Sequence, residues 1–267
     1  MSKIIGIAAL ARSGKDTVAS MLLKHKGVTT YALADPLKIG CQVLFGLTDD
    51  ETWNDDFKEI EIPLWCWSPR KFFQTIGTDW LRELNPEHWL LRADLELNQN
   101  LSNDSGETKC NLRDHKAHFK LAAQAIFGLS NEETWNSKLS NRVNDFWQLT
   151  PKQMVDFIKD HAFAEFSDFE DLRIKKEISL PTRTILKHDK NDIVIIKDVR
   201  FENEAAFLRS HNGVIWHIKR DNALKVISHS SEKGIEVKSG DLVIENNGSL
   251  EDLEFVVEKK WRDFVYG

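Results

Sequence analysis

A short apolar segment that runs into a glycine-lysine turn and then into a helical pattern opens the chain. Residues Lys3 to Ala9 read KIIGIAA, LARSG follows, and the pattern from Lys15 to Lys24 is helical. An apolar run of this length that ends at such a turn is typical of a buried strand. Because helical crossovers cover both faces of a parallel sheet, we expect an α/β fold with helices on both faces.

Strand and helix patterns alternate again at the other end of the chain. Further strands are predicted at Thr29–Leu33, Asp192–Lys197, Gly213–Ile218 and Asp241–Glu245, and helices at Glu202–Ser210 and about Leu250–Phe264. Alternation of this kind indicates βαβ units. We therefore predict a core formed by residues 1–34 and 192–267, with residues 35–191 inserted as a helical lobe.

Composition narrows the classes of function. The 267 residues suit one large domain or a core with an inserted lobe. The net charge of −6 disfavours binding to extended nucleic acid, which wants a basic face. Three unpatterned cysteines fit a reducing compartment, and no apolar run approaches the roughly 18 residues of a membrane helix. We expect a soluble, cytoplasmic protein without a membrane partner.

The predicted lobe contains an internal repeat. A shift of 82 residues aligns QVLFGLTDDETWN at Gln42 with QAIFGLSNEETWN at Gln124, and the register holds onward to Ile76 and Ile158. We interpret this as a duplicated helical module, copy one at about residues 38–80 and copy two at about 120–162. Its tryptophans are predicted to serve packing, namely Trp53, Trp65, Trp135 and Trp147.

The turn AALARSGKDT at residues 8–17 is the strongest chemical signal. It follows the phosphate-loop pattern G-x-x-x-x-G-K-[ST] at Gly14 and Lys15, with Ala9 in place of the first glycine and Asp16 in place of the hydroxyl residue. Backbone N–H groups at the start of a helix bind phosphate oxygens, and the lysine adds a cation. The turn therefore predicts phosphate binding.

Four blocks resemble a known family. They are ARSGKDT at Ala11; ADPLK at Ala34 followed by FGLTDDE; SPRKFFQTIGTDWLR at Ser68 with PEHW; and IIKDVRFENEA at Ile195 with HSSE and ENNGSLEDL near the end of the chain. Together they resemble the bacteriophage deoxynucleoside monophosphate kinases of the P-loop nucleoside monophosphate kinase group. The resemblance implies transfer of phosphate from ATP, with Mg²⁺, to a deoxynucleoside monophosphate, which gives a deoxynucleoside diphosphate and ADP.

The expected donor site lies beyond the carboxyl ends of the strands, where ligands of such sheets bind. The resemblance also implies a lid at about residues 220–240 and an adenine loop after the last strand. The predicted catalytic residues are Lys15, Arg12, Asp198 and Arg200, and the predicted ATP-binding residues are Ser13, Gly14, Lys15, Asp16, Thr17, Arg220, Asn246, Asn247 and Gly248. Asp16 and Asp198 are expected to hold the metal ion through water. His229, Ser231 and Glu232 match a family block without an assigned step.

The acceptor site is expected in copy one of the repeat. Arg70 can pair bidentately with a phosphate, and Gln74 lies one helical turn further on the same face. The complete predicted set is Asp35, Lys38, Arg70, Gln74, Thr78, Asp79 and Arg82. Copy two carries Ala117 for Asp35, Lys152 for Arg70 and Ala164 for Arg82, so it is predicted to enlarge the lobe or to form the contact of a homodimer.

Other functions fit the same scaffold. A phosphomevalonate-type kinase would use the core with a different acceptor, because a fold does not fix a substrate. A nucleotide-binding module that no longer transfers phosphate would explain Asp16 and Ala9. A nucleic-acid ATPase is disfavoured by the acidic charge balance.

Overall fold

The computed structural model describes residues 3–10, 12–98, 108–181, 183, 193–197, 199–221 and 235–266. Contacts divide the chain into two compact units. The first comprises Met1–Leu33 with Leu186–Gly267, and the second comprises Ala34–Ile185. Within the described ranges, no helix has both the length and the apolar character that crossing a bilayer requires.

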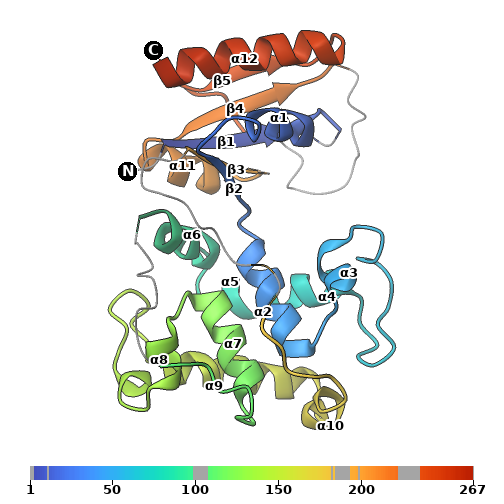
Figure 1. Cartoon of the computed structure of the whole chain (residues 1–267), viewed down its shortest axis with the longest axis vertical. Coiled ribbons are helices and arrows are strands. Elements are labelled where there is room, and N and C mark those ends of the chain that lie inside the picture. The colour runs from blue at the N-terminus through green and yellow to red at the C-terminus, as the bar shows by residue number, and fades with distance from the viewer. Residues whose placement is uncertain are drawn as a thin grey trace. The chain divides into compact units, whose positions relative to one another are not determined.

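The first unit is built on a five-stranded sheet in the order β2-β3-β1-β4-β5, in which every neighbouring pair is parallel (Figure 1). Register pairs Ile5 with Ile195 and Ile7 with Trp216. The strands are β1 (Lys3–Ala9), β2 (Val28–Tyr31), β3 (Ile193–Ile196), β4 (Val214–Lys219) and β5 (Leu242–Glu245). Each predicted strand is confirmed, with ends that differ by at most two residues, and so is the α/β fold class.

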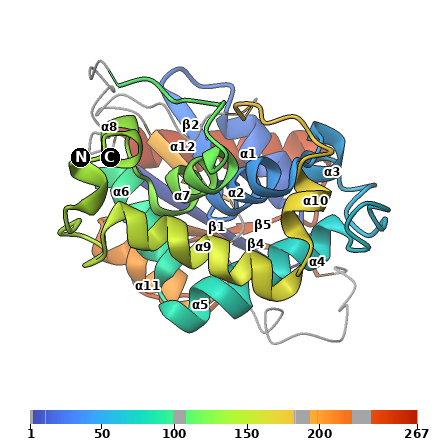
Figure 2. The same cartoon turned by 90° about the horizontal axis from the view of Figure 1, so that it is seen from below.

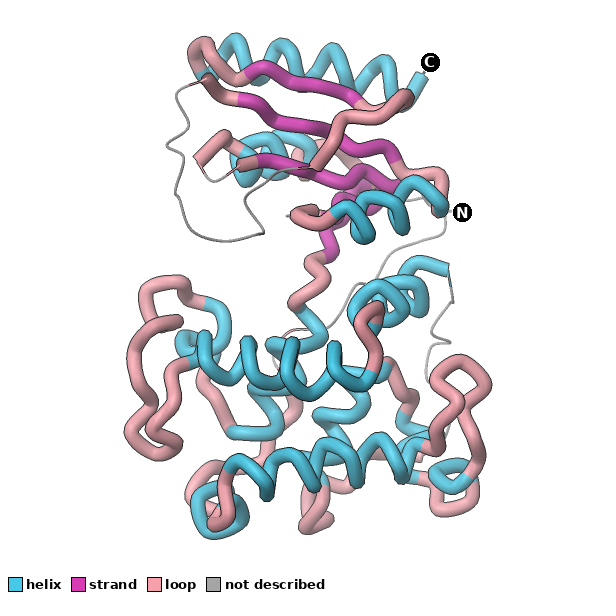
Figure 3. The backbone as a smooth tube through the Cα atoms, turned by 180° about the vertical axis from the view of Figure 1, so that it is seen from behind, coloured by secondary structure: helices cyan, strands magenta, loops and turns pink. Residues whose placement is uncertain are grey.

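Helices cover both faces of this sheet. They are α1 (Lys15–Leu22), α11 (Glu202–Ser210) and α12 (Leu250–Tyr266). Ile5 and Ile7 share a buried cluster with residues of α1 and α12. Gly6 faces the other way, where a Cβ would meet Leu208 of α11 at 2.7 Å. The alternation along β1 therefore places α1 and α12 on one face and α11 on the other (Figure 3).

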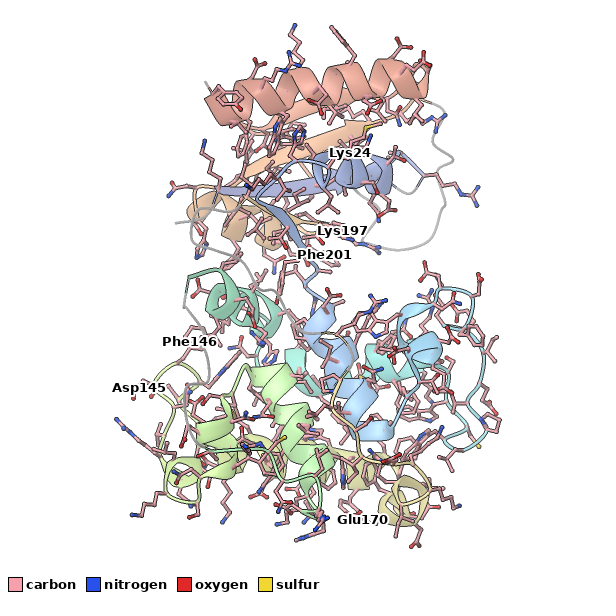
Figure 4. The ribbon with its side chains drawn as sticks, viewed as in Figure 1. Lys24, Asp145, Phe146, Glu170, Lys197 and Phe201 are labelled. Carbon is pink, nitrogen blue, oxygen red and sulfur yellow. The ribbon has the colours of Figure 1, made fainter. Side chains whose placement is uncertain are left out.

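Contacts between α1 and α12 fix one side of the first unit. Lys24, which follows α1 (Figure 4), pairs with Glu254 of α12 at 2.8 Å. The His25 ring stacks on Trp261 with 4.3 Å between ring centroids. Since α1 leaves β1 on one face and α11 leaves β3 on the other, the direction of the chain's crossovers switches between these neighbouring strands, and ligands of such sheets bind at the carboxyl ends there.

The second unit is helical (Figure 2). Its core is one cluster that includes Phe45, Phe72 and Trp65 from copy one together with Phe119 and Phe127 from copy two. The elements of copy one and the residues after it are α2 (Asp35–Phe45), α3 (Asp49–Trp53), α4 (Pro69–Gln74), the π-helix η1 (Thr75–Trp80), α5 (Leu81–Leu84) and α6 (His88–Asn98). Those of copy two and the residues after it are α7 (Ala117–Phe127), α8 (Asn131–Trp135), the 3₁₀-helix η2 (Leu139–Asn141), α9 (Pro151–Glu165) and α10 (Phe169–Arg173).

The two copies fold alike, which confirms the repeat. The first two helices of each copy have the same lengths and the same offset of 82 residues, and each second helix begins with a capping box, at Thr48 and at Ser130. Isolated bridges recur at Ile62–Trp67 and Asn144–Leu149. The indole N–H groups also act alike: Trp65 donates to the carbonyl of Phe45 at 3.1 Å, and Trp147 to that of Phe127 at 2.7 Å.

The copies hold each other through two arginines. Arg173, which follows copy two, donates to the carbonyls of Val43 and Leu44 at the end of α2. Arg92, which follows copy one, donates to the carbonyl of Ala125 at the end of α7. Guanidinium groups at these positions satisfy the free carbonyls of a helix C-terminus. Each first helix is therefore capped from the far end of the other copy.

One helix differs between the copies. Residues 75–80 of copy one form the π-helix η1, whereas the equivalent residues 157–162 of copy two lie inside the regular helix α9. Gly77 of η1 lies against α2, where a Cβ would meet Leu37 at 2.7 Å, and its carbonyl accepts from the Trp89 indole at 3.0 Å. Isolated π-helical turns are frequent at functional sites, so this difference marks copy one.

Candidate functional site

The predicted donor residues follow the carboxyl ends of parallel strands. Arg12 to Thr17 follow β1, Arg200 follows β3, Arg220 follows β4, and Asn246 to Gly248 follow β5. Because all these strands are parallel, their carboxyl ends lie at one edge of the sheet. Asp198, the other residue predicted after β3, lies outside the described residues, as do His229, Ser231 and Glu232.

The phosphate loop adopts a tight left-handed conformation. Arg12 has φ of 64° and Gly14 has φ of 97°, and the Ser13 N–H donates to the Leu10 carbonyl at 3.2 Å. Successive N–H groups in such turns form concave anion sites. Lys15 begins α1 and lies 3.4 Å from the Asp16 carboxylate, which is 79% exposed. Thr17 and Arg12 are exposed as well.

The Asn246 side chain supports this loop by a hydrogen bond to its backbone. Its Nδ2 donates to the Ser13 carbonyl at 2.8 Å, and its own N–H donates to the Lys219 carbonyl at 2.7 Å. The side chain is buried, and a Cβ on Gly14 would lie only 2.4 Å from the amide nitrogen. The resemblance implies that Asn246 belongs to the adenine loop, and the described contacts show that it also supports the phosphate loop.

Arg200 lies in the loop between β3 and α11. The loop is tied to β1 by the Val199 N–H, which donates to the Ile7 carbonyl at 2.9 Å. Glu204 accepts from the N–H groups of Arg200 and Phe201, at 2.8 and 3.2 Å, and so satisfies two free donors at the start of α11. Figure 4 marks Lys197 and Phe201 on either side of this loop. The Arg200 side chain is exposed.

The residues that precede β5 are anchored to α11. Asp241 accepts from Arg209 at 2.6 Å and from His217 at 3.0 Å. Burial opposes ionisation of this carboxyl, but hydrogen bonds from Arg209, the Lys238 N–H and His217 outweigh it and lower the pKa of Asp241 to about 2. The far end of the predicted lid segment is therefore fixed, while its residues 222–234 lie outside the described ones.

The N-terminus of α12 accounts for the conformation of Gly248 and Ser249, the residues that follow the asparagine pair. Ser249 accepts from the Asp252 N–H at 3.1 Å, and Asp252 accepts from both the N–H and the hydroxyl of Ser249. Gly248 has no room for a side chain, because a Cβ would meet the Asp252 carboxylate at 2.7 Å. Ser249 therefore acts as the N-cap of α12, and this cap determines the conformation of the loop before it.

In the second unit, Lys38 and Trp53 form the centre of the candidate acceptor site. Lys38 Nζ lies 5.2 Å from the Trp53 ring centroid and 5.8 Å from that of Phe73. The Arg183 guanidinium lies 4.1 Å from the same indole. A cavity of about 430 Å³ opens here, lined by Asp49, Asp50, Trp53, Asn54, Asp55 and Arg183. Trp53, which was predicted to serve packing, therefore also has two cationic side chains over its ring.

At the equivalent position of copy two, the charged side chains have partners within the same copy or next to it. Lys120 lies 4.6 Å from the Trp135 ring centroid, as Lys38 does over Trp53, but it also pairs with Asp114 at 2.7 Å. Thr108 donates to Glu132, which stands where copy one has Asp50. In the part of the chain that the structure describes, Lys38 has no carboxylate partner. The matched lysines of the two copies therefore differ in their ion pairing, among the residues that the structure describes.

The remaining predicted acceptor residues lie on α4, η1 and nearby elements. Arg70 begins α4, where its side chain pairs with Glu59 and its N–H donates to the Lys58 carbonyl at 2.9 Å. Gln74 ends α4 one turn later. Thr78 and Asp79 are exposed on η1, Arg82 is half-buried on α5, and Asp35 begins α2 half-buried.

Arg173 is buried at the end of α10. It is 2% exposed and donates to three backbone carbonyls, among them that of Lys176. Burial lowers the pKa of Arg173 to about 10. Its role is structural, whereas Arg183 reaches the Trp53 indole. The different roles of these two arginines follow only from their tertiary contacts.

A five-stranded parallel sheet with this order, a glycine-lysine loop before its first helix and cationic residues at its carboxyl edge define a kinase fold of the P-loop class. A model of the deoxynucleotide monophosphate kinase family matches residues 3–56 and 177–257, which is more than half of the chain. The chain therefore belongs to the deoxynucleotide monophosphate kinase family and is a nucleotide phosphotransferase.

Relatives with similar full-length sequences are viral. The deoxynucleotide monophosphate kinase of Enterobacteria phage T4 is 23% identical over 258 residues, which cover 94% of this chain and 95% of the relative. That of Escherichia phage RB69 is 24% identical over 269 residues, with 96% and 98% covered. A relative from Acanthamoeba polyphaga mimivirus is 26% identical over 253 residues, with 93% and 91% covered.

Proposed function

We propose that this enzyme transfers the γ-phosphoryl group of ATP, with Mg²⁺, to a deoxynucleoside monophosphate and releases ADP and a deoxynucleoside diphosphate. The observation that carries the proposal is the phosphate loop, in which a left-handed Gly14 precedes Lys15 at the first turn of α1. Aligned N–H groups and a lysine at a helix N-terminus suit the triphosphate of a nucleotide. The printed names of the phage relatives support the choice of acceptor.

The proposed reaction exchanges one phosphorus–oxygen bond for another. An oxygen of the acceptor phosphate bonds to the γ-phosphorus as the bond to the β-phosphate oxygen breaks, and ADP leaves with that oxygen. Catalysis of such a transfer depends on alignment and on neutralising charge. We assign Lys15 and Arg12 to the donor phosphates, Arg200 to the transferring group and Arg220 to the triphosphate, because each follows a strand at the carboxyl edge.

Asp16 has the chemistry to hold magnesium through water. Its carboxylate is exposed beside Lys15 in the first turn of α1, and Mg²⁺ prefers carboxylate oxygens together with several waters. We assign Asp198 to the same task from its place in the sequence. When bound, the ion would neutralise phosphate oxygens of the donor.

We assign the acceptor to copy one. Lys38 and Arg183 supply positive charge beside the Trp53 indole, and a nucleobase can stack on an aromatic or guanidinium plane. Arg70 on α4 suits the acceptor phosphate once it leaves Glu59. Asp35, Gln74, Thr78, Asp79 and Arg82 complete the assignment. Copy two, in which Asp114 neutralises Lys120, is assigned a structural role.

The proposal is tested by measuring ADP formation from ATP and Mg²⁺ with each deoxynucleoside and ribonucleoside monophosphate in turn. Turnover with some deoxynucleotides is expected, and Lys15→Ala should abolish it. Magnesium should be required, so excess chelator should stop the reaction. If no nucleoside monophosphate increased the rate of ADP formation, the proposal would be overturned. That result would point instead to a different acceptor or to a binding module.

A further inference from the structure

The two asparagines after β5 reach different loops. Asn246 Nδ2 donates to the Ser13 carbonyl at 2.8 Å. Asn247 accepts from the Asp221 N–H through Oδ1 at 2.9 Å and donates to the Asp221 carboxylate through Nδ2 at 2.8 Å. Ser13 belongs to the phosphate loop, and Asp221 follows Arg220. Neighbouring side chains thus connect two segments that are more than 200 residues apart in the chain.

The Asn246 contact fixes the direction of one peptide group. In a trans peptide the carbonyl and the N–H point in opposite directions. The Ser13 carbonyl is held toward Asn246, so the N–H of Gly14 must point away from Asn246, where it is free to meet a phosphate oxygen. The left-handed φ of Gly14 and the 2.4 Å that separates a Cβ there from Asn246 Nδ2 leave no other residue type at this position.

The Asn247 contact fixes the backbone around Arg220. On one side of Arg220, the Lys219 carbonyl accepts from the Asn246 N–H at 2.7 Å. On the other side, Asp221 forms a ring of two hydrogen bonds with the Asn247 side chain. The residues before and after Arg220 are therefore attached to consecutive residues of one short turn, and the same turn holds the phosphate loop.

We propose that Asn246 and Asn247 are positioning residues. They hold the Gly14 N–H and the backbone of Arg220 in a fixed arrangement relative to each other, so that both can bind the phosphate chain of a nucleoside triphosphate. This inference rests on the proposed function. Both positions require an amide: Asn246 must donate to a carbonyl, and Asn247 must accept and donate at once. A carboxylate at 247 would face the Asp221 carboxylate, and like charges this close repel.

A side-chain exchange tests the Asn247 contact without disturbing the core, because Asn247 and Asp221 are both exposed. Asn247→Asp replaces the hydrogen bond to the Asp221 carboxylate by a repulsion between two carboxylates. We expect the KM for ATP to rise about tenfold, which is the effect of losing one strong hydrogen bond, and the KM for the acceptor to stay unchanged. Asn247→Asp combined with Asp221→Asn allows both hydrogen bonds again, because the backbone N–H of residue 221 still donates and the side-chain hydrogen bond runs in the opposite direction. The double exchange should therefore return the KM for ATP to within about twofold of wild type.

A second measurement separates positioning from general stability. In an Arg220→Gln background, Asn247→Asp should add no further loss of ATP affinity in calorimetric titration, because the arginine it positions is gone. Full additivity, or an Asn247→Asp enzyme with wild-type KM, would overturn the inference while leaving acceptor-dependent ADP formation by the wild-type enzyme intact. A wild-type enzyme that forms no ADP would instead overturn the proposed function.

Discussion

Arg92 and Glu96 form an ion pair at 2.5 Å inside the helical unit, with side-chain exposures of 2% and 5%. The pair lies one turn apart on α6, and the guanidinium also donates to the Ala125 carbonyl at 3.0 Å. A charge this deeply buried is tolerated only while it is paired. This pair therefore joins the residues after copy one to the helix that opens copy two.

Removal of one partner should be costly. Arg92→Met leaves Glu96 buried and unpaired, so the free energy of unfolding should fall by about 3–5 kcal/mol. Arg92→Met with Glu96→Leu removes both charges and should cost only about 1–2 kcal/mol, chiefly the lost cap on α7. Urea titration of the two variants measures the difference, and equal losses would contradict the explanation.

Acid should destabilise the helical unit through buried histidines. Burial, assisted by the charge of Arg173, lowers the pKa of His118 to about 3. Burial likewise lowers the pKa of His88 to about 4, although its hydrogen bond to the Ile126 carbonyl opposes the shift. The ordinary histidine pKa is 6.5, so the unfolded chain binds more protons below that pH than the folded chain does.

The stability that these histidines contribute is therefore complete above pH 6.5 and is lost as the pH falls toward 4. Each should add a slope of about 1.4 kcal/mol per pH unit to the free energy of unfolding in that window. His118→Leu removes a ring whose nitrogens have no partner among the described residues and should flatten the slope by about half. Urea midpoints at pH 7, 6, 5 and 4.5 provide the measurement, and an unchanged slope would rule out this cause.

The phosphate loop should not tolerate a methyl group. Gly14→Ala forces a left-handed alanine and a clash with Asn246, so the KM for ATP should rise about tenfold or more. Gly240 has a similar φ of 94°, but a Cβ there meets nothing within 4 Å. Gly240→Ala should lower the free energy of unfolding by about 1 kcal/mol with the KM for ATP within about twofold of wild type. Steady-state kinetics at saturating acceptor distinguishes the two variants.

Matched lysines of the repeat test the acceptor assignment. Lys38→Met should raise the acceptor KM about tenfold and leave stability nearly unchanged, because Lys38 lacks a carboxylate partner among the described residues. Lys120→Met should do the reverse, since it removes the lysine partner of the half-buried Asp114 and costs about 1 kcal/mol of stability. Acceptor titrations and urea unfolding on the same preparations separate the two effects.

Arg70 and Lys152 form a second matched pair. Arg70→Ala should abolish measurable acceptor saturation, because a bidentate phosphate contact is lost, and Lys152→Ala should behave as wild type. ATP binding by calorimetry should be unaffected in both. Equal losses of acceptor binding in the two variants would remove the distinction between the copies.

The core strands and the phosphate loop could be predicted because local pattern decides them. Apolar runs such as IVII at Ile193 allow only a buried strand at that length, and the turn before Lys15 needs Gly14 for its backbone. The repeat likewise fixed the positions of α7 and α8 from those of α2 and α3. Such features depend on neighbours within a few residues or on a copy of the same pattern.

The features missed by the sequence depend on distant contacts. The π-helix is set by Gly77 against Leu37 of α2, and its sequence aligns without a gap to an ordinary helix in copy two. The partner of Asn246 is Ser13, 233 positions away. Arg183 and Arg173 look alike in sequence, yet one reaches an indole and the other is buried against carbonyls.

The reciprocal arginine caps have a consequence for how such a duplication can be reversed. Deletion of copy two would remove Arg173 and leave the end of α2 uncapped, and deletion of copy one with α6 would do the same to α7. In a shortened chain, the arginine of a second molecule would have to supply the missing cap, so a contact within one chain would become a contact between two molecules.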